Sequence, residues 1–101
     1  MFIPIDKYRF DGPYDDIKKI RDEPGVFLIV YKLNNEHYLL DVDYSNEMSK
    51  DILTHKRKPC WDSYNKGEIM YAILLKEKYP DDDIKKIVDT VRNNFKDIPC
   101  K

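Results

Sequence analysis

Apolar runs separated by polar turns predict three strands in this sequence. Residues 26–31, Val-Phe-Leu-Ile-Val-Tyr, form a β-branched and aromatic run of strand length. Residues 33–36 supply turn-forming side chains, and residues 37–42 return as a second strand, which predicts an antiparallel hairpin. Residues 68–76 predict a third strand, and the residues on one side of it are Ile69, Tyr71, Ile73 and Leu75.

Three further segments have the apolar spacing of helices. Pro13 suits a first helical turn, and apolar residues then recur every three positions up to Arg21. A second helix begins at Ser45 or Asn46, and residues 59–67 are expected to form the loop that follows it. The last helix begins after three aspartates, and its apolar face consists of Ile84, Ile87, Val88, Val91 and Phe95.

The predicted elements follow one another as helix, strand, strand, helix, strand, helix. Three strands must bury their faces under the helices, so we expect a small α/β domain of the α+β type. Its architecture would be a three-stranded antiparallel sheet flanked by helices. Strand and helix periodicities predict one core between the sheet and the last helix, made of Phe27, Ile29, Tyr71, Ile73, Val88 and Val91.

The composition is that of an ordered and highly charged protein. The chain has 101 residues, which predicts one domain over residues 1–101, and 42% of the residues are hydrophobic while 37% are charged. No apolar stretch approaches the roughly 20 residues that span a bilayer, and residues 1–4 lack the features of a signal peptide. We therefore expect a cytoplasmic protein with no membrane segment. The net charge of −1 means that any binding of nucleic acid needs a local basic patch.

The sequence contains two cysteines, Cys60 and Cys100. They lie far apart in the chain, and neither a Cys-x-x-Cys pair nor two neighbouring histidines accompany them, so the sequence offers no zinc site. In a reducing compartment both are expected to be free thiols.

Several short motifs occur in a fixed order between residues 24 and 100. They are Gly25-Val26-Phe27, then Ser45, Met48, Ile52 and His55 counted without gaps, then Cys60-Trp61, Gly67 and Pro99-Cys100. This order resembles the GIY-YIG nuclease domain. The resemblance implies a small domain built from a hairpin, a helix, a third strand and a closing helix.

The resemblance also implies where catalytic residues would lie. In active members, a tyrosine from each of two strand motifs and an arginine from the next helix line a cleft, while a glutamate on a later helix holds one divalent metal ion. At the first tyrosine this chain has Phe27, which lacks the hydroxyl. The second motif becomes Asp41-Val42-Asp43 in the gapless count, or Tyr38-Leu39-Leu40 by spacing from Gly25, and neither keeps the glycine of that motif.

The two remaining roles are also altered. The arginine position becomes Asp51, whose negative charge would repel a phosphate. The metal-binding glutamate falls at Val88 or Asp89, and only Asp89 could coordinate a cation. The candidate positions of a degenerate site are therefore Phe27, Tyr38, Asp41, Asp51, His55 and Asp89.

The histidines and aspartates allow further interpretations. His55 follows Asp51 by four residues, so the two could interact on one helix as an acid–base pair or as a structural pair. His37 is expected at the surface. Asp41 and Asp43 could join Asp51 around a metal ion, but alternation along a strand instead sends Asp41 and Asp43 to solvent together.

Cations alternate with aromatic residues after the second helix. The nucleic-acid-binding candidates are Lys56, Arg57, Lys58, Trp61 and Lys66. This combination can bind phosphates and stack on bases. The alternative is a solvated helix end whose cations suit the helix dipole, with Trp61 as a core anchor.

We therefore expect a catalytically silent GIY-YIG-like domain, without a cofactor, that acts by binding nucleic acid or a protein partner. One alternative is a divergent endonuclease that cleaves phosphodiesters, in which Asp89 holds Mg²⁺ or Mn²⁺ and Arg57 or a lysine replaces the missing arginine. Another is an unrelated small interaction protein. The sequence predicts neither the ligand nor the oligomeric state.

Overall fold

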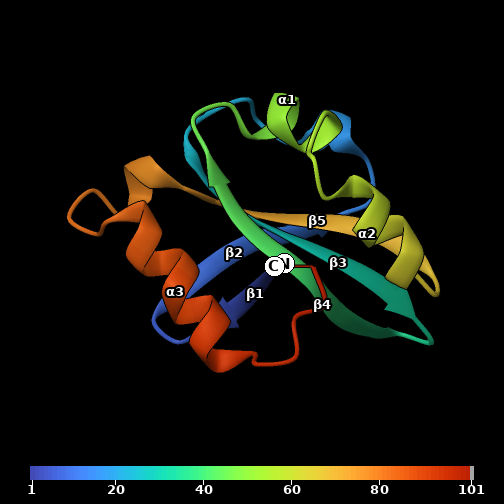
Figure 1. Ribbon diagram of the computed structural model, residues 1–101. Helices are drawn as coiled ribbons and strands as arrows, with labels where there is room; N and C mark the ends of the chain where they lie inside the picture. The colour runs from blue at the N-terminus through green and yellow to red at the C-terminus, as the bar shows by residue number, and fades with distance from the viewer. Residues whose placement is uncertain (101) are drawn as a thin grey trace.

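A curled, five-stranded antiparallel sheet forms the centre of the computed structural model, which describes residues 1–100 (Figure 1). The strands are β1 (Phe2–Ile5), β2 (Tyr8–Tyr14), β3 (Gly25–Leu33), β4 (Glu36–Ser45) and β5 (Glu68–Leu75), in the spatial order β1-β2-β5-β3-β4. The helices are α1 (Met48–Leu53), α2 (Lys58–Tyr64) and α3 (Ile84–Asn94), with short 3₁₀ turns η1 (Ile17–Lys19) and η2 (Lys76–Lys78). Within residues 1–100, no helix has the length and apolar character needed to cross a membrane.

The β3–β4 hairpin forms where the sequence predicts it. Asn34 and Asn35 form its two-residue turn with φ values of 53° and 66°, a left-handed geometry that asparagine tolerates and that matches strand twist. β3 lies between β4 and β5 and pairs with both along its length. The three predicted strands are therefore confirmed, and α3 forms where the last helix was expected.

The sheet buries side chains on both faces, and this makes two cores. Alternate residues of β3 point to opposite sides, so Val26 lies in one core with Val91 of α3 while Phe27 lies in the other with Trp61 of α2. The prediction of a single core is wrong for this reason. The α3 core contains Val88 and Val91, whereas the α1–α2 core contains Phe27, Ile29, Tyr71 and Ile73.

Other sequence predictions are wrong at the N-terminus and after α1. Two strands and η1 replace the helix expected over residues 13–21, so the sheet has five strands rather than three. Pro13 lies in β2 at an irregularity between Asp11 and Tyr14, where a missing amide hydrogen interrupts no ladder bond. Residues 59–67 contain α2 rather than only a loop, because Pro59 occupies a first-turn position that needs no amide hydrogen.

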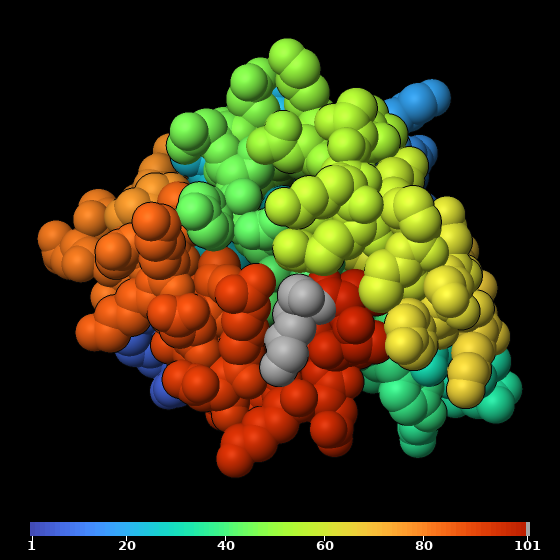
Figure 2. All heavy atoms as spheres, viewed as in Figure 1, coloured from blue at the N-terminus to red at the C-terminus, as the bar shows by residue number. Residues whose placement is uncertain are grey.

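The two cysteines form a disulfide, which corrects the expectation of free thiols. Cys60 of α2 and Cys100 are 40 residues apart in sequence, and their Cα atoms are 5.9 Å apart. The amide of Cys100 also donates to the carbonyl of Leu40 at 3.0 Å. Figure 2 shows the resulting arrangement, in which the segment after α3 lies between α3 and the α2 region.

Candidate functional site

A β-bulge in β4 directs two aspartates to the face of the sheet that carries α1 and α2. Ile29 of β3 pairs with Asp41, whereas the next residue, Val30, pairs with Leu39, so Leu40 is the extra residue. Such a bulge re-aims side chains. Asp41 and Asp43 consequently lie on one face, as expected, but α1 and α2 cover that face. The prediction that both point to solvent is wrong, since Asp41 is fully buried at 0% exposure.

Asp41 accepts four hydrogen bonds and has no contact with solvent. Its donors are the Val42 amide at 2.8 Å, Arg57 Nε at 2.7 Å, Arg57 Nη2 at 3.1 Å and Trp61 Nε1 at 2.7 Å. A buried carboxylate is costly unless charge and hydrogen bonds compensate it, and here both do. Asp41 therefore attaches α2 and the preceding turn to the middle of β4.

Asp43 and His55 form a second pair beside the first. His55 Nε2 lies 2.8 Å from Asp43 Oδ2, and Arg57 Nη2 donates to the same oxygen at 3.1 Å. The Arg57 amide donates to His55 Nδ1 at 3.1 Å, so Nδ1 carries no hydrogen and Nε2 is the donor. With both ring nitrogens bonded and its side chain only 8% exposed, His55 has no nitrogen free to act as a base toward a bound molecule.

Arg57 links the two carboxylates. Its side chain is 22% exposed and contacts both Asp41 and Asp43. Burial by itself lowers the pKa of Arg57, but the hydrogen bonds and negative charges of Asp41 and Asp43 outweigh it, so the net pKa is raised. The guanidinium is therefore permanently charged, and its charge is compensated inside the protein.

Aromatic rings enclose the histidine. The His55 ring lies 5.8 Å from the buried Phe27 ring in an edge-on arrangement and 5.0 Å from the Trp61 ring. We call Asp41, Asp43, His55, Arg57 and Trp61 the polar cluster. Phe27 thus fills space next to the polar cluster without offering a hydroxyl.

Asp51 lies outside the polar cluster. It accepts a hydrogen bond from Ser45 Oγ, and Ser45 Oγ in turn accepts one from the Glu47 amide at 2.8 Å. The interaction expected between Asp51 and His55 is therefore replaced by one with the end of β4. Asp51, Asp43 and His55 nevertheless line one pocket of about 270 Å³, together with Tyr44, Thr54 and Lys56.

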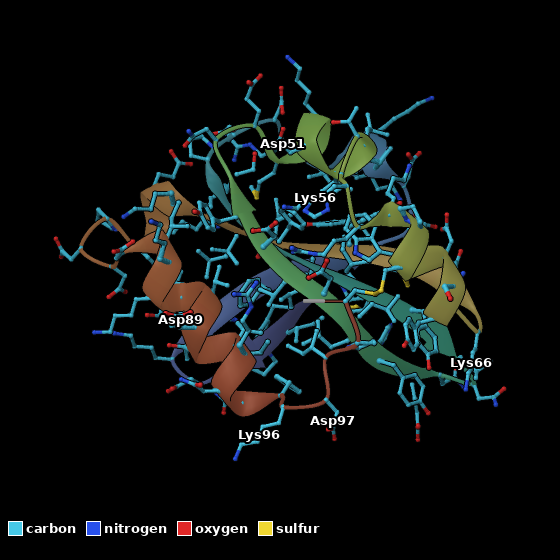
Figure 3. All side chains as sticks on the ribbon, viewed as in Figure 1. Asp51, Lys56, Lys66, Asp89, Lys96 and Asp97 are labelled. Atoms are coloured by element: carbon cyan, nitrogen blue, oxygen red, sulfur yellow. A yellow bond between two sulfur atoms is a disulfide. The ribbon has the colours of Figure 1, made fainter. Side chains whose placement is uncertain are left out.

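The predicted basic patch is dispersed. Lys56 is exposed, and Lys58 Nζ donates to the Leu53 carbonyl at 3.4 Å. Figure 3 shows Lys66 well away from Lys56, beyond the far end of α2. Trp61 is buried and uses its indole nitrogen on Asp41, so its place is in the core.

Tyr38 and Asp89 are also not part of the polar cluster. Tyr38 is exposed on β4 and stacks on Tyr31 with ring centroids 5.0 Å apart. Asp89 is exposed on α3, which packs on the opposite face of the sheet from α1 and α2 (Figure 3). Among residues 1–100, no three His, Cys, Asp or Glu side chains are grouped closely enough to hold a metal ion.

The sequence indicated most members of the polar cluster but not their pairing. Phe27, Asp41, His55, Arg57 and Trp61 come together, while Tyr38, Asp51, Lys66 and Asp89 do not. The sequence interpretation did not identify Asp43 as the partner of His55. The Asp-x-Asp pattern of residues 41–43 within an apolar strand is the feature that could have indicated it. The chain matches no family model, and comparison with curated proteins and with solved structures gives no match.

Proposed function

We propose that this chain is a catalytically silent GIY-YIG-like domain that acts by binding a partner, and that the partner is a protein. The order of β3, β4, α1, β5 and α3 supports the GIY-YIG-like part of the proposal. The main support for the absence of catalysis is that the side chains of the polar cluster already have hydrogen-bond partners within the protein. Asp41, His55 and Arg57 direct their hydrogen bonds to one another and to neighbouring protein groups.

Nucleic acid is the less favoured partner. Arg57 is neutralised by two carboxylates, and the indole of Trp61 is buried, so neither is free to bind a phosphate or a base. Lys56, Lys58 and Lys66 remain as candidates for phosphate contacts. Binding of a labelled single-stranded oligonucleotide that weakens with salt and is lost on Lys56→Ala/Lys58→Ala substitution would support nucleic acid instead.

The divergent-nuclease alternative requires Asp89 to hold Mg²⁺ or Mn²⁺ close to the residues that activate water. Its position on the far side of the sheet from His55 and Arg57 argues against that arrangement. The test is incubation of the purified chain with DNA or RNA and either metal ion. We expect no cleavage. Cleavage that needs the metal and disappears in a folded Asp89→Ala variant would overturn the proposal.

Location in the cytoplasm stays a prediction. The Cys60–Cys100 disulfide favours an oxidising compartment, because thiol systems of the cytosol keep most cysteines reduced. Thiol labelling of the protein in freshly opened cells, with and without prior reduction, tests this point. Labelling without reduction would support the cytoplasm.

A further inference from the structure

Among residues 1–100, no strand pairs with the outer edge of β4 over its first residues. The two-residue turn makes Leu33 and Glu36 a hydrogen-bonded pair, and such pairs alternate along an antiparallel ladder. Tyr38 therefore bonds to β3, whereas the backbone groups of His37 and Leu39 point away from the sheet. These two residues present N–H and C=O groups along an edge that faces outward.

The rest of this edge is closed by the protein itself. The Val42 amide donates to its neighbour Asp41, and the Tyr44 amide donates to Asp43, each at 2.8 Å. The carbonyl of Leu40 accepts from Cys100. Because side chains and the C-terminal segment occupy these groups, the open edge is confined to Glu36–Leu39.

A pocket lies on each side of the open edge. On the α3 side, a pocket of about 330 Å³ is lined by Leu39, Phe95, Lys96, Asp97 and Ile98, among others. On the α2 side, a pocket of about 210 Å³ is lined by Tyr31, Tyr64 and Lys66, among others. Tyr38, Leu39 and Asp97 line both pockets. Successive side chains of a strand point to opposite faces, so a strand added here would direct alternate side chains into the two pockets.

We propose that Glu36–Leu39 receives an extended segment of the partner protein as an additional strand, with alternate side chains entering the Phe95 pocket and the Tyr64 pocket. This inference rests on the proposed binding function and names the surface and the kind of partner. Backbone hydrogen bonds supply affinity in this mode, and pockets for alternate side chains supply specificity.

The linings of the two pockets also indicate the character of the segment. Leu39, Phe95 and Ile98 favour an apolar side chain on the α3 side. Lys66 and Lys96 form no ion pair within residues 1–100, and Asp97 is the single acid among the residues that line the pockets. The exposed carboxylate of Glu36, which accepts the Tyr38 hydroxyl, and that of Asp97 balance the two lysines, so an extended segment with an apolar residue for the Phe95 pocket suits this edge better than a strongly charged one.

Peptides selected from a random phage-displayed library against the full chain provide the probe. We expect selected synthetic peptides to shift the backbone amide resonances of His37 and Leu39. His37→Pro removes one outward N–H at an edge that tolerates proline, and Tyr38→Ala removes one wall of a pocket. Each should weaken peptide binding by about fivefold or more, which corresponds to one net hydrogen bond or one buried contact.

Tyr44→Ala is the matched control. Tyr44 lies on the same strand and is 43% exposed, compared with 41% for Tyr38, but its amide is already bonded to Asp43. It should leave affinity unchanged within about twofold. Equal losses in Tyr38→Ala and Tyr44→Ala, or a selection that yields no binding peptide, would overturn the proposal.

Two other occupants are separate outcomes of the same experiment. A dimer that His37→Pro dissociates would mean that a second copy uses the edge, and a single-stranded oligonucleotide that alone shifts Tyr31 and Tyr64 would mean base stacking. Either result overturns the peptide proposal. Peptides that bind at another surface overturn this inference but not the binding function, which fails separately if the protein cleaves nucleic acid.

Discussion

His55 donates its Nε2 hydrogen to Asp43 Oδ2 across 2.8 Å, which joins the turn after α1 to the C-terminal part of β4. The opposite ring nitrogen accepts from the Arg57 backbone, so the chain turns from α1 to α2 around this imidazole. A free catalytic base would keep one nitrogen available for a bound molecule. The geometry thus gives His55 a structural role.

The first prediction concerns the tautomer of His55. At about pH 8, where an ordinary histidine is neutral, nitrogen-detected NMR should show hydrogen on Nε2 and none on Nδ1. His37 is exposed and supplies an internal control that should average between tautomers. A hydrogen on Nδ1 of His55 would contradict the described bonds.

The second prediction tests the two-core architecture. Val91→Ala should lower the free energy of unfolding by about 1–3 kcal/mol, and Phe27→Leu by about 1–2 kcal/mol, through lost burial and cavity formation. Because the two residues pack on opposite faces of the sheet, the double variant should show the sum within about 0.5 kcal/mol. Urea unfolding measures all three. A larger departure from additivity would favour the single core predicted from sequence.

Local patterns were sufficient for the hairpin and for α3. Apolar residues alternate in residues 68–76 and recur at helical spacing from Ile84 onward, and each pattern directly indicates an element with a buried face. The inward direction of Asp41 depended on a bulge at Leu40 and on α2 covering the strand, and neither is visible in strand alternation. The pairing of Cys60 with Cys100 likewise depends on where α2 and the C-terminal segment meet in space.

The third prediction concerns alkaline pH. Burial raises the pKa of Tyr8, with Asp82 adding to the effect and Lys7 opposing it, and burial also raises the pKa of Tyr71. The unfolded chain therefore loses the protons of these two tyrosines at a lower pH than the folded protein does. The stability that the two protonated tyrosines contribute is present below about pH 10 and lost as pH rises through the folded-state pKa values. Tyr8→Phe/Tyr71→Phe should make stability fall less steeply above about pH 10.

The control for this prediction is Tyr64→Phe, whose ring is exposed. Its pH profile of urea unfolding should follow that of the unaltered protein. Identical alkaline slopes in the unaltered protein and in the double variant would show that Tyr8 and Tyr71 are not responsible.

The fourth prediction concerns the disulfide. Closing a loop between residues 40 positions apart restricts the unfolded chain, and this should contribute about 2–4 kcal/mol to stability. Cys60→Ser/Cys100→Ser should lower the free energy of unfolding by that amount in the absence of reductant. A reductant should bring the unaltered protein to the same value. If reductant and substitution both leave the unfolding curve unchanged, the two cysteines are not bonded in solution.

The most direct test of the structural role of the polar cluster compares two neighbouring cations. Arg57→Met keeps an apolar stem but leaves buried Asp41 without its ionic partner, so we expect a loss of about 2–4 kcal/mol in unfolding free energy. Lys56→Met alters an exposed lysine and should change stability by less than about 0.5 kcal/mol. Urea unfolding of both variants at neutral pH provides the measurement. A folded Arg57→Met protein as stable as Lys56→Met would contradict the account and return Arg57 to the candidates for binding phosphate.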